Sequence, residues 1–382
     1  MKKMRFVALL LTAVLCGNLV LSALAAETTR PDPSETAAEE ENGFFEDLLH
    51  WLFAEEEFHD SGDLSLPKLS EEEIVQLLAD NPTDIQQDVY EQEPLCTAPY
   101  ATGKVKTEVL QAAANRLTAL RRLAGLPGVT LDPSLCENAQ YGAVLLAKIG
   151  ELDHTPSNPG DMPDWFYRQA YAATSSSNLA KTGRWTSSWK APSKDGPAQA
   201  VDLLMEDTFV LSVGHRRWQL NPSLKKVGFG YVAQETAPEK GGVSLDEYTV
   251  EKVFDNSGNV RNYNFIAWPA SGNFPDSQRP GVWSISLNPE KFQKPVQSRI
   301  RITLTRESDG MVWKFGGSDG WLSVDTGGYG IDNCIMFSPG QIGGDPNSFK
   351  CTGTYTVRVE GLTKYSGQSV NTFEYQVNFV DA

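Results

Sequence analysis

The sequence has few of the residues that usually carry enzyme chemistry. It contains 4 histidines, 5 cysteines and 6 methionines in 382 residues. It has no His-Glu-x-x-His zinc motif, no Gly-x-x-x-x-Gly-Lys-Ser/Thr phosphate loop and no Gly-x-Gly-x-x-Gly dinucleotide fingerprint. The sequence therefore does not indicate a zinc peptidase, a phosphate-loop NTPase or a dinucleotide-dependent oxidoreductase.

Basic residues are also scarce. The chain has 33 lysines and arginines against 49 aspartates and glutamates, which gives a formal net charge of −16. Binding to nucleic acid needs a clustered basic face, so we do not expect nucleic acid as a partner. Between residues 27 and 94 lie 21 of the 49 carboxylates, with only Arg30 and Lys68 to balance them. Repulsion between the acidic runs predicts a flexible leader over residues 27–95.

One segment of this leader, 43–58, departs from the acidic composition. Its apolar residues recur at helical spacing, which predicts a short helix. Such a helix either docks on its own protein, which we favour, or binds a partner or a surface.

Long apolar runs are absent after the first 26 residues. A basic start, Met1 to Arg5, precedes an apolar run and the small residues 22–26, a pattern typical of a cleaved signal peptide. A retained membrane anchor and a lipoprotein modified at Cys16 are less favoured, because no basic stop-transfer cluster follows and the bulky Leu15 precedes the cysteine. We therefore expect a signal peptide over 1–26, a protein that is secreted or held at the cell surface, and no transmembrane segment after cleavage.

Four cysteines remain after this cleavage, an even number that is compatible with disulfides in an exported protein. Cys334 and Cys351 are close in sequence within a strand-rich region, so we expect them to pair. Cys96 and Cys136 are the pair left over. No Cys-x-x-Cys is present, which argues against a thiolate zinc site or a redox motif.

The pattern of apolar residues changes along the chain from helical to strand-like. Helices are predicted from Thr107 to about Leu123, from Pro133 to about Ile149 with Asp132 as its cap, and from Ala198 to about Met205. After Lys226, alternating segments separated by Gly, Pro, Asn and Asp predict strands, and residues 262–382 read as an all-β sandwich of Ig-like type. The expected fold class is α+β.

Several segments between residues 105 and 256 resemble the CAP superfamily, which includes cysteine-rich secretory, antigen-5 and pathogenesis-related proteins. The stretch 114–148 resembles its first two helices, and "LDHTP" at 152–156 resembles the loop with its first histidine. "SSSNLA" at 175–180 stands where the family has a Gly-Glu-Asn turn. "GHRRWQLNPSLKKVGFG" at 214–230 resembles the second histidine segment in the form seen in bacterial members.

The resemblance implies a three-layer α-β-α sandwich with a cleft lined by two histidines and two acidic residues. His154 and His215 match the histidines, and Ser177, before Asn178, replaces the first glutamate. The second acidic residue falls in "VDLLMEDT", at Glu206 or Asp207. The implied cleft then combines two imidazoles, one carboxylate and a hydroxyl.

Three readings of these residues remain open. The imidazoles of His154 and His215 orient their loops, hold zinc with modest affinity, or act in acid–base catalysis. The resemblance implies an extracellular binding module for a small molecule, a lipid or an extracellular protein, with the β-sandwich as a spacer or adhesive domain. The alternative is a metal-assisted, peptidase-like hydrolase.

Two further segments of the β-rich half have a functional and a structural reading. Trp268, Phe274 and Trp283 either form an exposed stacking platform or, as we favour, fill the core of the sandwich. The run "GGYGIDN" at 327–333 carries one acidic residue among glycines, which is a weak indication of calcium.

In "HRRW" at 215–218, we expect one arginine to be paired with an acidic residue and one to be exposed.

Overall fold

A computed structural model describes residues 66–84, 88–188, 190–207, 210–237, 241–339, 352–365, 369–370 and 373–382. Contacts divide the chain into two compact units, Met1–Glu55 and Glu56–Ala382, and all described residues belong to the second. The predicted signal peptide, the segment 43–58 and Cys351 lie outside the described residues. Within the described ranges, no helix is long and apolar enough to cross a membrane.

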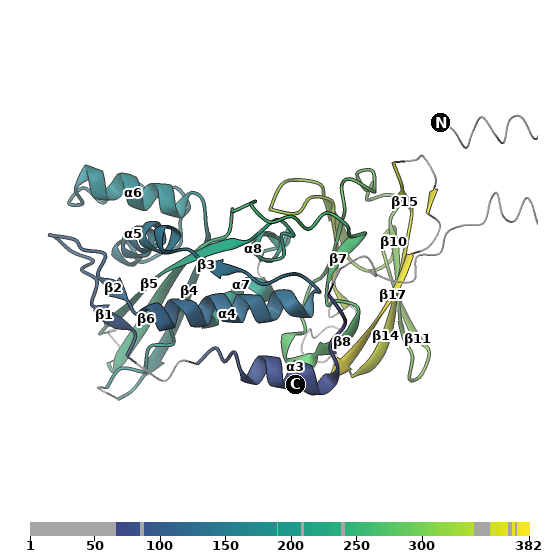
Figure 1. Cartoon of the computed structure of the whole chain (residues 1–382), viewed down its shortest axis with the longest axis horizontal. Helices are drawn as coiled ribbons and strands as arrows, with labels where there is room; N and C mark the ends of the chain where they lie inside the picture. Colours follow the sequence, from purple (N-terminus) through teal and green to yellow (C-terminus); the bar gives the residue numbers. More distant parts are fainter. Residues whose placement is uncertain are drawn as a thin grey trace, which may run out of the picture. The chain divides into compact units, whose positions relative to one another are not determined.

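A four-stranded sheet forms the centre of the helix-rich half. Its strands, in sheet order, are β3 (Thr130–Leu131), β5 (Lys226–Thr236), β6 (Val243–Lys252) and β4 (Asn178–Thr186). One face packs against α5 (Pro133–Ile149) and α6 (Asp164–Thr174), and the other against α4 (Thr107–Leu123) and α7 (Pro197–Glu206). These are the three α-β-α layers that the resemblance implied (Figure 1).

The two best-marked helices begin and end where the sequence predicts. Asp132 caps α5 by accepting hydrogen bonds from the main-chain N–H groups of Ser134 and Leu135, and Pro133 lies in its first turn. Gly150 ends the helix with a φ of 80°. In contrast, α6 lies where the sequence pattern predicted a loop, because its many polar residues obscure the buried stripe formed by Phe166, Ala170 and Ala173.

Glycines on β5 let helix α5 approach the sheet closely. A Cβ atom at Gly228 would overlap the main chain of Leu135, and one at Gly230 would overlap the main chain of Ala139. The two glycines of "GFG" are therefore needed for packing of α5 on the sheet, because only glycine leaves room for the helix backbone.

Replacing Gly230 by Ala should destabilise the protein by about 3 kcal/mol, because the helix backbone would have to move away from the sheet. Urea denaturation of the wild type and the variant measures this change. Gly328→Ala is the matched control, since its Cβ would meet its nearest atom, in Asp332, at an ordinary 3.6 Å. Equal stability of the two variants would contradict the packing argument.

The C-terminal half is an all-β region of two sheets that share one core. The five-stranded sheet, in order, contains β11 (Met311–Phe315), β10 (Arg301–Arg306), β14 (Gly353–Glu360), β17 (Phe373–Val380) and β8 (Gly272–Pro275). The four-stranded sheet contains β12 (Leu322–Asp325), β13 (Cys334–Phe337), β9 (Trp283–Leu287) and β7 (Phe265–Trp268). Within these two sheets the described strand pairs are antiparallel, except that β17 and β8 are parallel.

The aromatic residues of this region fill its core. Trp268, Phe274 and Trp283 are each 1% exposed or less, which confirms the core reading over an exposed platform. Trp283 from one sheet and Phe379 from the other have ring centroids 5.7 Å apart. Smaller elements complete the described chain: β1 (Tyr90–Gln92), β2 (Lys104–Val105), the 3-10 turn η1 (Asp276–Gln278), β15 (Leu362–Thr363) and β16 (Ser369–Val370).

Part of the predicted leader is not irregular, so the expectation of a flexible segment is wrong for residues 66–84. They contain α3 (Glu71–Ala79), which begins with a capping box in which Ser70 and Glu73 bond each other's main chain. Ile74 is fully buried in the main core. Local capping and one apolar face therefore outweigh the repulsion among the three glutamates of the first turn.

The expected pairing of Cys96 with Cys136 is not formed, since both are free thiols in the structure. Cys136 is buried on α5, and Cys96 is partly buried against the hydrophobic cluster that includes Ala139 and Ala143 of that helix. Burial raises the pKa of each thiol to about 11, so both are protonated at neutral pH. Cys334 is also a free, buried thiol.

The division of the chain into a CAP-like domain at 105–256 and a sandwich at 262–382 stays a prediction, because both halves lie in one compact unit.

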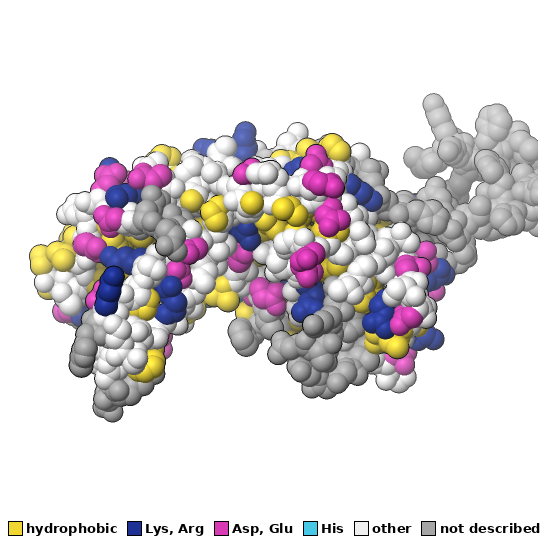
Figure 2. All heavy atoms as spheres, turned by 90° about the horizontal axis from the view of Figure 1, so that it is seen from below, with side chains coloured by type: hydrophobic (Ala, Val, Ile, Leu, Met, Phe, Trp, Pro, Cys, Tyr) yellow, Lys and Arg dark blue, Asp and Glu magenta, His cyan; other side chains and the backbone are white. Residues whose placement is uncertain are grey.

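On the face drawn in Figure 2, basic and acidic side chains of the described residues lie next to one another.

Candidate functional site

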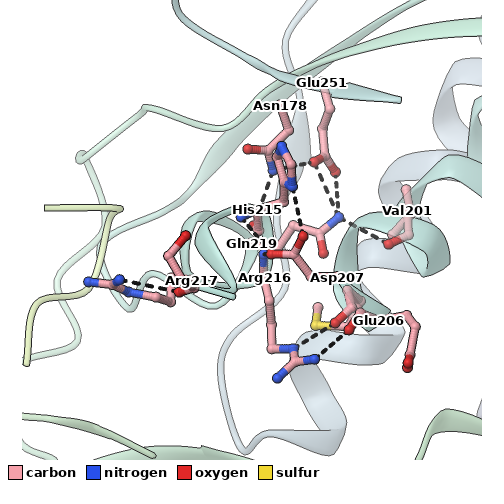
Figure 3. A network of polar contacts seen from close by, with 11 residues as sticks. Asn178, Val201, Glu206, Asp207, His215, Arg216, Arg217, Gln219 and Glu251 are labelled. Atoms are coloured by element: carbon pink, nitrogen blue, oxygen red, sulfur yellow. Dashed lines mark hydrogen bonds and ion pairs between the residues drawn. The ribbon is translucent and has the colours of Figure 1, made fainter. Parts of the chain in front are cut away.

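The short helix α8 (Gly214–Gln219) presents His215, and Asp207 fixes the orientation of this histidine. The Nδ1 atom of His215 lies 2.8 Å from Asp207 Oδ1. Asp207 Oδ2 accepts the main-chain N–H groups of His215 at 3.0 Å and Arg216 at 3.3 Å. The side chain of Asp207 is 2% exposed and that of His215 is 24% exposed. Asp207 therefore holds the Nδ1 edge of the ring (Figure 3), while Nε2 makes no hydrogen bond with any other described residue.

A second buried carboxylate lies beside this pair. Glu251 on β6 is opposite Asn178 on β4 and is fully buried. Its Oε2 accepts a hydrogen bond from Asn178 Nδ2 at 2.9 Å, and its Oε1 accepts one from Gln219 Nε2 at 2.9 Å. Asn178 also donates to the carbonyl oxygen of His215 at 3.1 Å. The two side-chain amides thus connect the sheet to helix α8 (Figure 3).

The environment raises the pKa of both titratable groups, Glu251 and His215. Burial raises the pKa of Glu251 to about 7, although the hydrogen bonds from Gln219 and Asn178 and the nearby His215 lower it. Burial lowers the pKa of His215, but its hydrogen bond to Asp207 and the charges of Asp207 and Glu251 outweigh burial and raise that pKa. Both shifts favour the protonated forms of these side chains.

His154 is exposed on the loop between α5 and α6. Its Nδ1 lies 2.9 Å from the carbonyl oxygen of Thr174, and Thr174 Oγ1 donates to the carbonyl oxygen of His154 at 3.2 Å. The structure therefore ties both histidines to the same turn, His154 through Thr174 and His215 through Asn178.

The serines of this turn close the end of α6. Ser177 is 1% exposed and donates to the carbonyl oxygen of Ala173 at 2.6 Å. Ser176 donates to Ala172 at 2.6 Å and accepts from Lys252 Nζ at 2.7 Å. Burial lowers the pKa of Lys252. The hydroxyl that the sequence placed in the cleft at Ser177 is therefore used inside the fold.

Of the two acidic candidates from "VDLLMEDT", only Asp207 bonds His215. Asp207 follows the last residue of α7 with a φ of 49°, which turns its side chain back towards α8. Glu206 Oε1 instead accepts the N–H of Gly281 from the all-β region at 3.2 Å.

Zinc binding at His154 and His215 stays a prediction. Among the described residues, no group of three His, Cys, Asp or Glu side chains could hold a metal ion. The oxygens of Asp207 and Glu251 already accept hydrogen bonds, so the available donors are the imidazoles of His154 and His215. Zinc sites in proteins usually have three or four protein ligands.

Both arginines of "HRRW" are buried, which corrects the expectation that one is exposed. Arg216 is 0% exposed and donates to the carbonyl oxygens of Met205 at 2.6 Å and Val282 at 2.7 Å. Arg217 is 1% exposed and donates to Asp325 Oδ2 at 2.8 Å and to the carbonyl oxygen of Ile331. Residues from both halves of the chain therefore hold α8, and with it His215 (Figure 3).

The loop 325–331 of the all-β region has a structural role that replaces the weak indication of calcium. Its Gly327 accepts a hydrogen bond from Arg217, and the guanidinium carbon of Arg217 lies 4.9 Å from the centre of the Tyr329 ring. Gly330 leaves room for Trp218, since a Cβ atom at this position would lie 2.7 Å from that side chain.

The same half contains the letters Gly-x-Ser-x-Gly at 316–320, but they connect strands β11 and β12 and open no helix, unlike a nucleophile elbow.

The sequence interpretation missed Glu251 and Gln219. The available signal was the alternation of Glu247, Thr249 and Glu251 within a strand whose other residues are largely apolar. Polar residues at every second position of a buried strand must find partners across the sheet face, so they indicate a polar network.

Comparisons with known proteins support the family assignment. Residues 114–246 match the family model described as "Cysteine-rich secretory protein family" (CAP). A solved structure titled "Manganese-bound Ac-ASP-7" matches at 14% identity with a TM-score of 0.23, covering 47% of this chain and 83% of that chain. At this TM-score the likeness has no bearing on the ligand of the present chain. No curated protein matches the sequence. Residues 114–246 therefore form a CAP domain, which is followed by a C-terminal all-β region.

Proposed function

We propose that this protein is an exported binding module that contacts its ligand through His215. The observation that carries the proposal is the bonding of His215 to Asp207, with Asp207 itself saturated by two main-chain N–H groups. This arrangement fixes the ring and leaves Nε2 without a hydrogen bond to any other described residue, while both neighbouring carboxylates are buried. A rigid, partly exposed imidazole suits recognition, because little freedom is lost when a ligand binds.

Binding is favoured over turnover because no activated nucleophile accompanies the histidine. Among the described residues, the hydroxyls of Ser176 and Ser177 donate to carbonyl oxygens of α6. A hydrolase of this type would need a nucleophile within reach of the base, or a metal-bound water. The export of the protein rests on the predicted signal peptide, and the ligand class stays open among a small molecule, a lipid and an extracellular protein.

Solvent extraction of the purified protein, followed by mass spectrometry, tests for a ligand that copurifies from the expression host. We expect His215→Ala to reduce binding of that compound about tenfold or more, which corresponds to about 1.4 kcal/mol. His154→Ala should have a smaller effect, because that ring is exposed and its Nδ1 contacts only the main-chain carbonyl oxygen of Thr174 at the end of α6. Equal binding by the wild type and His215→Ala would contradict the proposal.

The alternative, a metal-assisted hydrolase, makes a different prediction. Peptidase and esterase assays with added zinc would then detect turnover, and His154→Ala and His215→Ala would each abolish it without lowering the melting temperature. We expect no turnover, and calorimetric titration with zinc should show weak binding or none, since two imidazoles are the available donors.

A further inference from the structure

The all-β region contains a polar groove that is separate from the site around His215. A cavity of about 450 Å³ lies against the five-stranded sheet, a volume within the usual range for small-ligand sites. Its floor comes from β14 and β17, and one side comes from β8 and the segment before α3. The lining side chains used below are Asn273, Thr354, Thr356, Glu374, Gln376 and Asn378.

The groove has a polar floor because both strands alternate strictly. Along β14, Tyr355 and Val357 are buried in the core, while Thr354 and Thr356 face outward. Along β17, Tyr375 and Val377 are buried in the same way, so Glu374, Gln376 and Asn378 face the groove. Paired strands thus present a surface of hydroxyls and side-chain amides.

Hydrogen bonds hold these groups in fixed positions. Thr354 Oγ1 donates to Asn378 Oδ1 at 3.1 Å, and Asn378 Nδ2 donates to Asn273 Oδ1 at 2.9 Å. Asn273 Nδ2 in turn donates to the carbonyl oxygen of Leu69 at 3.1 Å, which joins β8 to the segment before α3. A parallel bond runs from Gln376 Nε2 to Thr356 Oγ1 at 3.2 Å. The groove is therefore preorganised across four segments of the chain.

The charges around the groove balance one another. Lys68 Nζ lies 3.1 Å from Ser271 Oγ at one side, and Glu374 is paired with Arg358 at 2.7 Å. A site for phosphate or another anion would need an excess of basic groups, and a site for a cation an excess of acidic ones. Hydroxyls and amides that both donate and accept match an uncharged ligand with many hydroxyl groups.

A peptide added as a further strand fits this groove less well. Strand β8 is the edge of the sheet on this side, and α3 with its preceding segment packs against that edge. Lys68 and Leu69 contact Ser271 and Asn273 there, so the edge is covered.

We propose that this groove binds a short stretch of neutral oligosaccharide, with Gln376 and Asn378 as its central contacts. Their amides would bond sugar hydroxyls from the floor, while the ring faces lie against the sheet surface. The proposal is independent of the site around His215, so each can be tested without the other.

The test uses the full chain and a panel of neutral tetrasaccharides: cellotetraose, maltotetraose, laminaritetraose, mannotetraose and chitotetraose. Calorimetry or ligand-observed NMR should detect binding of at least one of them by the wild type. Gln376→Ala and Asn378→Ala should each weaken that binding about tenfold or more, since each removes a side-chain amide that can both donate to and accept from a sugar hydroxyl. Thr303→Ala is the matched control, because Thr303 faces outward on β10, outside the groove, and should bind like the wild type.

Thermal unfolding of each variant separates loss of binding from loss of folding. If Asn378→Ala unfolds early, Lys68→Ala provides a second variant, since its side chain closes the groove from a different element. The proposal is overturned if no tetrasaccharide binds the wild type at about 10 mM. This concentration is about ten times a dissociation constant of 1 mM, so even weak specific binding would be detected. It is also overturned if the groove variants bind like Thr303→Ala, or if inorganic phosphate binds more tightly than every sugar.

Discussion

Replacing Arg217 by Met is expected to destabilise the protein by about 3–5 kcal/mol, the range for breaking a buried ion pair from one side. The guanidinium is 1% exposed and bonds Asp325, and it also donates to main-chain oxygens of Ile331 and Ser212. Methionine fills much of the volume but leaves these acceptors without their donor. Guanidinium chloride denaturation at pH 7 measures the loss.

Arg306→Met is the matched control for this prediction. Arg306 pairs with Asp309 three residues away, and their side chains are 27% and 45% exposed. An exposed pair of this kind is screened by solvent, so the control should change stability little. Similar losses in the two variants would show that burial of Arg217 does not stabilise the contact between α8 and the all-β region.

Replacing Glu251 by Gln should stabilise the protein at pH 7 and above by up to about 3 kcal/mol, and flatten its stability between pH 4.5 and 7. Burial raises the pKa of Glu251 from 4.5 to about 7, so the folded state binds more protons than the unfolded state in that interval. The stability of the wild type therefore falls as pH rises through it. Glutamine carries no charge, so the cost of burying its side chain does not change with pH over this interval.

Urea denaturation of both proteins from pH 4 to pH 8 measures this difference. The raised pKa of His215 acts in the same direction, but its contribution is lost as pH rises above 6.5, so the difference between the two proteins is read between pH 4.5 and 6.5. Glu290→Gln is the control, because that side chain is 63% exposed and should leave the profile unchanged. Equal pH dependence in Glu251→Gln and the wild type would show that the pKa of Glu251 is not raised in the folded protein.

Much of the secondary structure could be predicted from the sequence. Helices α4 and α5 were predicted from their apolar spacing and from local signals such as Asp132, Pro133 and Gly150, all within one turn of the helix ends. The strands of the all-β region were predicted because outward and inward residues alternate along them. These signals come from residues close together in the chain, so they can be read from one sequence without the tertiary structure.

The predictions that failed concern segments whose order depends on distant partners. Helix α3 was missed because acidic composition was given more weight than the buried Ile74 and the cap at Ser70. The pairing of Cys96 with Cys136 was inferred from an even count, although distance in space decides whether a disulfide forms.

By itself, the sequence determined the CAP-like layers, the following all-β region and the two histidines worth testing. Only the tertiary structure decided that Asp207 rather than Glu206 holds His215, that Glu251 lies beside it, and that both arginines of α8 are buried. The reason is that these choices depend on contacts between residues far apart in the chain, such as Asn178 with Glu251 and Arg217 with Ile331. Sequence spacing carries no information on which of two neighbouring side chains turns towards such a partner.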